Sequence, residues 1–128
     1  MSRETLLRGK RVDNGEWVVG YPYQIKSKGL WFIDDGYTVS HQVIPETIGQ
    51  YTGLNDKNGV EIYEGDILKR QGEVRLGLYN YTFRGLYGNY PIFGCGYYTI
   101  KHYDISPLHT KYEYEVIGNI HDNKLEVE

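Results

Sequence analysis

Short runs in which apolar and polar residues alternate, separated by turn residues, fill most of this 128-residue chain. Trp17, Val19, Tyr21 and Tyr23 occupy every second position, and the segment 37–44 alternates in the same way. A period of two is typical of a β-strand, which sends successive side chains to opposite faces. The pattern predicts strands at residues 5–12, 16–24, 30–33, 37–44, 61–63, 67–69, 73–83, 97–104 and 112–120.

The residues between these runs set the expected connections. Asn14-Gly15 is typical of a type I′ hairpin turn, whose two central residues both need positive φ. Pro22 cannot donate to a strand ladder, so we expect it at the edge or end of a sheet. Residues 45–50 fit one short helical turn at most. The glycine-rich region Arg84–Gly96 indicates a long loop or an irregular hairpin.

Composition strengthens the β prediction. The chain has no alanine and one methionine, against 14 tyrosines and 16 glycines. Alanine is the best helix former, whereas aromatic side chains suit a pleated surface and glycines suit turns. We therefore predict a mainly β protein, a small antiparallel meander or barrel-like units of the SH3-like kind, with minimal helix. Residues 1–128 are expected to form one domain, with 1–52 and 53–128 as candidate subdomains.

Charge argues about the kind of partner, and the first residues and the cysteine content favour a cytoplasmic protein. The net charge of −3 argues against a strongly basic nucleic-acid binder. The first residues lack the apolar stretch of a signal peptide, and no apolar run approaches the roughly 20 residues of a membrane-spanning helix. Cys95 is the single cysteine and cannot form an intrachain disulfide, which fits a reducing compartment.

The tyrosine-rich region, residues 79–103, stands above this background. Its aromatic residues are Tyr79, Tyr81, Phe83, Tyr87, Tyr90, Phe93, Tyr97, Tyr98 and Tyr103. Three interpretations stay open: core packing, a protein interface rich in tyrosine and arginine, and stacking on single-stranded nucleic acid. The candidate interaction surface consists of Tyr79, Tyr81, Phe83, Arg84, Tyr87, Tyr90 and Lys101.

The alternation along 73–83 favours self-association through this region. If the strand stays regular, Tyr79, Tyr81 and Phe83 lie on the face opposite Val74, Leu76 and Leu78. An aromatic face left bare would exceed the apolar patches that soluble monomers tolerate. Another sheet or the Arg84–Gly96 loop could cover it, but the glycines suit that loop poorly as a lid. We therefore expect a second subunit as the cover.

Two groupings of residues that include a histidine are candidates for chemistry. Cys95 lies between two glycines with His102 seven residues on, but no cysteine-enzyme motif surrounds it. His102, Asp104 and His109 could offer metal ligands, but they lack the spacing of a closed zinc site. We expect no bound metal and no catalysis at either place.

Paired acidic residues have simpler explanations. Glu64 and Asp66 flank a glycine, and Asp34 and Asp35 sit together in a turn, where acidic side chains often bond backbone amides. His41 is interpreted as a structural residue. No glycine pattern forms a phosphate-binding loop. The sequence predicts no cofactor and no enzyme.

Several stretches share a recognisable pattern, and they cover about half of the chain. They are Leu7–Lys10, Gly15–Val18 with Gly20, Val43–Leu54, Asp56–Gly59, Glu61–Ile67 and Tyr114–Ile120. Together they resemble the YopX family of bacteriophage and prophage proteins, whereas Arg70–Lys111 matches no pattern of that family. The resemblance implies a phage or prophage gene, action in the cytoplasm of a bacterial host, and a β-rich fold of barrel-like units. It implies no catalytic residue.

The expectation for function combines these arguments. We expect a non-enzymatic phage accessory protein that binds another protein, either a host target or a second copy of itself. The alternative is single-stranded nucleic-acid binding through residues 79–103. Six basic residues against two acidic ones between Lys69 and Lys111 permit this alternative, although the overall charge opposes it. A hydrolase of an unrecognised type, built around Cys95 or His102, is the third hypothesis.

Overall fold

The fold is described from a computed structural model, which covers residues 7–37, 39–110 and 112–122. The chain divides into two compact units, Met1–Gly53 and Leu54–Glu128. Each unit is an antiparallel β structure in its described residues, and each is described by itself. The predicted mainly β fold is confirmed.

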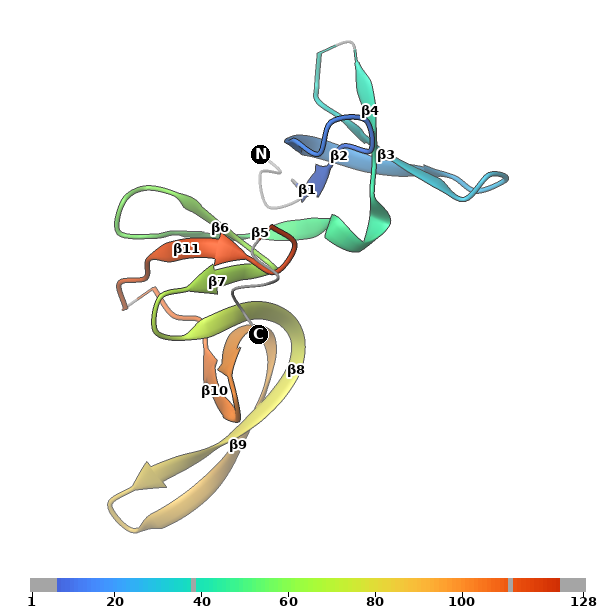
Figure 1. The fold of residues 1–128 in the computed structure, drawn as a ribbon. Helices are drawn as coiled ribbons and strands as arrows, with labels where there is room; N and C mark the ends of the chain where they lie inside the picture. Colours follow the sequence, from blue (N-terminus) through green and yellow to red (C-terminus); the bar gives the residue numbers. More distant parts are fainter. Residues whose placement is uncertain (1–6, 38, 111, 123–128) are drawn as a thin grey trace. The chain divides into compact units, whose positions relative to one another are not determined.

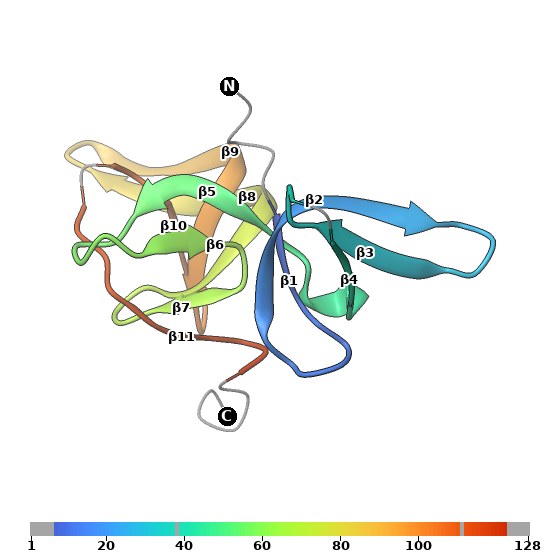
Figure 2. The same ribbon diagram turned by 90° about the horizontal axis from the view of Figure 1, so that it is seen from above.

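In unit 1 the first four strands form a meander in which sequence neighbours pair, and the fifth strand returns to pair with the first (Figures 1 and 2). Its sheet runs β4-β3-β2-β1-β5, with antiparallel neighbours. Its elements are β1 (Leu7–Lys10), β2 (Trp17–Ile25), β3 (Leu30–Asp34), β4 (Ser40–Val43), the 3₁₀ turn η2 (Pro45–Thr47) and β5 (Gly49–Asn55), which runs on past the unit boundary.

A small apolar centre holds unit 1 together. Ile33 and Val43 are fully buried, and Gly9 packs against both. A Cβ on Gly9 would lie 3.1 Å from Ile33 Cδ1, so a larger residue at position 9 would have to push this side chain aside. Thr47 closes the end of the meander, because its hydroxyl accepts from the Lys10 amide and donates to the Ile44 carbonyl.

The sheet-edge prediction for Pro22 and the turn prediction for Asn14-Gly15 have different outcomes. Pro22 is confirmed in a place with one neighbouring strand, because β1 pairs with β2 over Trp17–Gly20 and Pro22 pairs with Ile33 of β3. The type I′ turn at Asn14-Gly15 is wrong. Gly15 alone has positive φ there, and its amide bonds back to the Arg11 carbonyl in a longer turn. The Asn14 side chain instead accepts from the Glu16 amide.

Unit 2 holds the long hairpin of the molecule. Its sheet runs β10-β9-β8-β7-β11, while β6 lies beside β5 in the order of the first sheet. The described strands do not close into barrels, so the barrel-like units that the sequence predicted are not present. The strands are β6 (Glu61–Tyr63), β7 (Asp66–Leu68), β8 (Gly72–Gly85), β9 (Gly88–Lys101), β10 (Asp104–Pro107) and β11 (Val116–Asn119).

The core of unit 2 lies at the base of that hairpin. Ile62, Leu68, Val74 and Tyr114 are buried together. Partly buried side chains that pack against them are Leu54, Tyr97, Leu108 and Val116.

The carboxylate of Asp56 organises the loop above this core. Its Oδ1 accepts from the amides of Asn58 and Val60, at 2.8 and 2.9 Å, and its Oδ2 accepts from the Val116 amide at 3.0 Å. One buried side chain therefore joins the Asp56–Val60 turn to strand β11. Burial alone would raise the pKa of Asp56, but the three amide hydrogen bonds outweigh burial and lower that pKa.

The largest correction concerns Arg84–Gly96, expected as a loop or irregular hairpin. It is regular: β8 and β9 pair residue by residue from Glu73↔Ile100 to Gly85↔Gly88, and Leu86-Tyr87 forms a two-residue turn. The predicted strand 97–104 also breaks at His102, and the chain then returns as β10.

Candidate interaction surface

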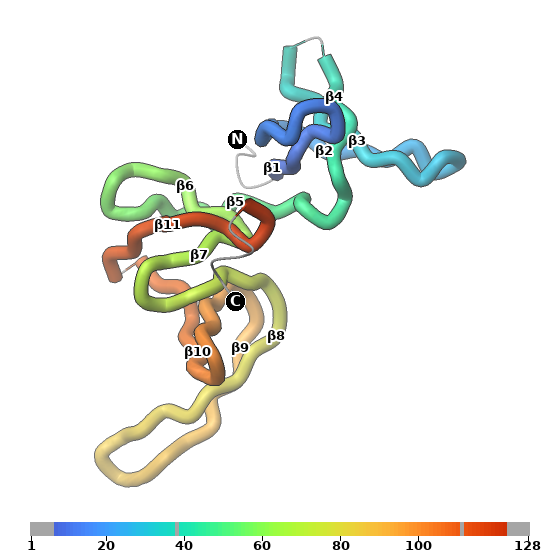
Figure 3. The backbone as a smooth tube through the Cα atoms, viewed as in Figure 1, coloured from blue at the N-terminus to red at the C-terminus, as the bar shows by residue number. Residues whose placement is uncertain are grey.

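Most of the β8–β9 hairpin is a two-stranded ribbon. Strand β7 pairs with β8 at Gly72 and Glu73, and β10 pairs with β9 over Tyr98–Lys101. Within the described residues, no third strand joins the ribbon between Leu76 and Gly96. Figures 1 and 3 show this part, in yellow and light orange, extending beyond β7 and β10. An isolated two-stranded hairpin is marginally stable in water, so its side chains must stabilise it.

One side of the ribbon, the aromatic face, carries Tyr79, Tyr81, Phe83, Tyr90 and Tyr98. The Tyr79 ring lies 5.3 Å from that of Tyr98 and 6.3 Å from that of Tyr81, between ring centroids. Aromatic contacts of this kind contribute roughly 0.5–1.5 kcal/mol each beyond area burial. The aromatic face thus covers part of its own surface.

Glycines make this stacking possible. Tyr79 is opposite Gly94, and its ring occupies the space that a Cβ on residue 94 would fill. Near the turn, a Cβ on Gly85 would lie 3.0 Å from Phe83 Cε2 and 3.2 Å from Tyr90 Cε2. The glycines that suggested a loop therefore seat aromatic rings of a regular hairpin.

The other side, the Leu78 face, carries Leu76, Leu78, Phe93 and Cys95 beyond the buried Val74. Leu78 is 82% exposed and Phe93 is 75% exposed. The register confirms the prediction that Tyr79, Tyr81 and Phe83 lie opposite Val74, Leu76 and Leu78. Of the aliphatic side chains, however, Val74 enters the core while Leu78 is left in solvent.

The structure brings four of the seven candidate residues together. Tyr79, Tyr81, Phe83 and Tyr90 share the aromatic face. Arg84 points to the opposite face, and Tyr87 is 88% exposed in the turn beside Leu86.

Lys101 is separate from the other candidates. It lies at the far end of β9, on the rim of a groove of about 450 Å³ beside Arg75, His102 and Ile117.

Leu78 and Leu86 are exposed but are not among the candidate residues predicted from the sequence. Leu78 could have been found from the distance along the strand. It lies four residues beyond Val74, where a small core no longer reaches.

The remaining aromatic residues of the region have three different environments. Tyr97 packs against the core of unit 2, and burial together with the nearby charge of Glu64 raises its pKa. Tyr98 joins the aromatic face, and Tyr103 is exposed in the β9–β10 turn. Core packing and surface display therefore both occur within residues 79–103.

A family comparison decides the relationship of the chain. The sequence profile of the YopX protein family matches residues 8–126. The chain belongs to the YopX family. The match includes residues 70–111, for which no family pattern was recognised in the sequence. No curated protein and no solved structure matches the chain. In the part of the chain that the structure describes, no helix is long and apolar enough to cross a membrane.

The proposed cysteine and histidine chemistry is not assembled in this YopX-family fold. Cys95 is exposed in mid-ribbon opposite Leu78, and His102 lies in the β9–β10 turn. Seven residues of extended strand span about 20 Å, which is beyond hydrogen-bond reach. His109 packs its ring against Tyr112, 5.9 Å between centroids. Among the described residues no three His, Cys, Asp or Glu side chains are grouped to hold a metal ion.

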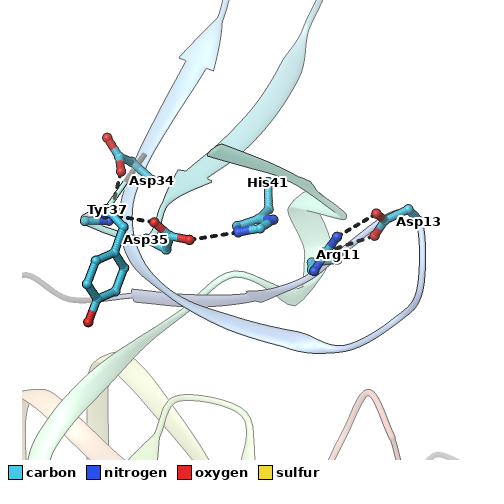
Figure 4. A network of polar contacts seen from close by, with 7 residues as sticks. Arg11, Asp13, Asp34, Asp35, Tyr37 and His41 are labelled. Carbon is cyan, nitrogen blue, oxygen red and sulfur yellow. Dashed lines mark hydrogen bonds and ion pairs between the residues drawn. The ribbon is translucent and has the colours of Figure 1, made fainter. Parts of the chain in front are cut away.

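The acidic turn residues bond backbone amides. Asp34 Oδ1 accepts from the Gly36 amide and Asp35 Oδ1 from the Tyr37 amide, both at 2.9 Å (Figure 4). Asp35 Oδ2 also lies 3.0 Å from His41 Nε2, so His41 has a partner within its own unit. The pKa of Asp35 is lowered, mainly by the hydrogen bond from the Tyr37 amide and next by the hydrogen bond with His41.

Two further carboxylates have local partners. In unit 1, Arg11 holds Asp13 through two hydrogen bonds of 3.0 and 2.7 Å (Figure 4). In unit 2, Asp66 Oδ2 accepts from the Tyr63 amide at 2.8 Å. These contacts give both carboxylates a structural role, one in a turn and one beside a strand.

Proposed function

We propose that this YopX-family protein acts by binding another protein through its β8–β9 hairpin and performs no catalysis of its own. The exposure of Leu78 and Phe93 on one face of an unpaired ribbon carries the proposal. Apolar side chains that protrude together from a soluble protein mark interaction sites. The setting is a bacteriophage or prophage accessory protein in the cytoplasm of its bacterial host.

The ribbon offers a partner both side chains and backbone. From Leu76 to Gly96 each strand has one neighbour, so one side of each carries backbone amides and carbonyls that another strand can bond. Strand addition at such an edge is a common mode of protein recognition. Backbone bonds supply affinity in this mode, and side chains such as Leu78 and Phe93 supply specificity.

Affinity capture from a phage-infected host tests the proposal. The wild-type protein is compared with a Leu78→Ser/Phe93→Ser double variant and with Val60→Ser, a control at an exposed apolar residue away from the hairpin. The expected result is a partner held by the wild type and by Val60→Ser and lost from the double variant. A partner set that is identical for all three proteins would remove the hairpin from the account.

Single-stranded nucleic acid is the second candidate, favoured by the charge of the hairpin. The segment from Val74 to Tyr103 contains Arg75, Arg84 and Lys101 and no acidic residue. Two groups that nucleic acid would contact already have partners within the protein, which counts against this function. Arg75 forms an ion pair with Glu73, with Nη2 and Oε1 3.2 Å apart, and the Tyr79 ring packs against Tyr98. Fluorescence anisotropy with a labelled oligonucleotide separates the two functions, because nucleic-acid binding weakens steeply as salt rises.

A further inference from the structure

The two edges of the ribbon are unequal. Hydrogen bonds at its base show which backbone groups point outward: the Val74 carbonyl accepts from Gly65, and the Tyr97 carbonyl accepts from Leu108. Because this orientation alternates along an antiparallel strand, the outward positions continue every second residue. On β8 they are Leu76, Leu78, Asn80, Thr82 and Arg84, and on β9 they are Asn89, Pro91, Phe93 and Cys95.

Proline blocks one of these edges. Pro91 has no amide hydrogen, so the outer edge of β9 lacks a donor in the middle of its free length. The outer edge of β8 has no proline and carries no charge until Arg84. Natural proteins protect free edges with proline, lysine or other charges, and β8 has none of these from Leu76 to Phe83.

We propose that two copies of this chain pair through their β8 edges, antiparallel, about a two-fold axis at Asn80. This proposal rests on the proposed function and specifies its partner. The axis at Asn80 is the one that uses the whole free edge, because β7 and Gly65 already occupy β8 up to Val74. Leu78 then pairs with Thr82 of the second copy, and Leu76 pairs with Arg84 of the second copy.

Charge complementarity favours this second copy over an unrelated strand. Arg84 is the one charge between Leu76 and Tyr98, so two hairpins paired near their tips would repel. With the axis at Asn80, each Arg84 lies opposite Leu76 of the other copy, next to Val74. Glu64 precedes Gly65, which bonds Val74, and its charge acts on Tyr97, the cross-strand neighbour of Leu76. In the paired dimer we expect each Arg84 to approach the Glu64 carboxylate of the other copy.

The pairing would also stabilise the ribbon. Two ribbons joined at β8 form a four-stranded sheet, and sheets of three or more strands are stable where a lone hairpin is marginal. Each outward pair exchanges two backbone hydrogen bonds, giving roughly ten across the axis. An isologous contact of this kind closes as a dimer.

Sedimentation equilibrium of the wild type, Asn80→Pro and Cys95→Pro tests the edge. Both proline variants lose an outward amide in mid-ribbon, one on β8 and one on β9, and Pro91 shows that such a position accepts proline. The expected result is a dimer for the wild type and for Cys95→Pro and at least about tenfold weaker association for Asn80→Pro. Equal association of the two variants would overturn the β8 edge, and circular dichroism confirms that both are folded.

A charge exchange tests the register. Arg84→Glu is expected to weaken the dimer about tenfold by placing two carboxylates together, and the added change Glu64→Arg is expected to restore it. Dimerisation indifferent to Arg84→Glu would overturn the register. A monomeric wild type that still captures a host protein through Leu78 and Phe93 would overturn the self-pairing and leave the proposed function standing. A monomeric wild type that also captures no partner through the hairpin would remove both.

Discussion

Tyr79 lies across the β8–β9 ribbon on top of Gly94, and its ring takes the place that a side chain at residue 94 would need. The contact explains how a glycine-rich segment remains a regular strand: the aromatic ring supplies the packing surface that glycine lacks.

Gly94→Ala tests this contact. The added methyl group must displace the Tyr79 ring, and we expect a loss of about 1–3 kcal/mol in the free energy of unfolding. The near-ultraviolet circular dichroism of the stacked tyrosines should weaken as well. Cys95→Ala, at the next residue on the exposed face, is the control and should change neither. Unchanged stability in Gly94→Ala would mean that the ring is not seated there.

Asp56→Ala tests the loop above the core of unit 2. The substitution removes the acceptor of three amides, those of Asn58, Val60 and Val116. The three hydrogen bonds are partly buried, and donors that lose their partner there are costly, so we expect a loss of about 3 kcal/mol, measured by urea unfolding. Asp34→Ala, which removes the acceptor of one amide in an exposed turn, should cost clearly less. Equal losses would contradict the role given to Asp56.

Acid should destabilise the wild type through the same carboxylate. The folded-state pKa of Asp56 is below the ordinary 3.8, so its ionised form is favoured in the folded protein. Its contribution is therefore complete above pH 3.8 and is lost as pH falls through the lower, folded-state pKa. Melting temperatures measured from pH 6 downward should fall more steeply below about pH 4 for the wild type than for Asp56→Asn. Parallel curves would rule out Asp56 as the source.

Tyr97 should titrate late in the alkaline range. Burial against the core and the charge of Glu64 both disfavour its phenolate, and its pKa lies above the ordinary 10.0. The folded state then holds this proton more tightly, so its contribution to stability is lost as pH rises through that pKa. Burial raises the pKa of Tyr114 as well, so the wild type should show a late component from both tyrosines. In an ultraviolet titration Tyr97→Phe should reduce this component, whereas the exposed-site variant Tyr87→Phe should retain it in full.

How far the sequence predicts this fold is clear from particular residues. Alternation placed Tyr79, Tyr81 and Phe83 opposite Val74, and the missing donor of Pro22 placed it beside a single neighbouring strand. Both follow from local rules that tertiary contacts do not change. The regular ribbon at Arg84–Gly96 was not predictable in this way, because it depends on cross-strand contacts such as Tyr79 with Gly94.

Two other features of the structure were not predicted from the sequence, for related reasons. Strand β5 has Gly53 at a φ of 88° and little alternation, but it pairs with β1 and lies beside β6. The candidate surface was chosen by aromatic content, so it included the self-stacked Tyr79 and omitted the exposed Leu78. Exposure depends on where the core ends, which the sequence gives only indirectly.

Residue-resolved amide exchange tests the central claim, protein binding through the β8–β9 hairpin, most directly. It is measured by NMR on dilute and concentrated protein, with the outward amides of β8 (Leu76, Leu78, Asn80 and Thr82) compared with those of Phe93 and Cys95 on β9. Binding at the β8 edge predicts protection of the β8 group that grows with concentration while the β9 group keeps exchanging rapidly. Rapid exchange of both groups at every concentration, and also with a captured host protein bound, would contradict the account.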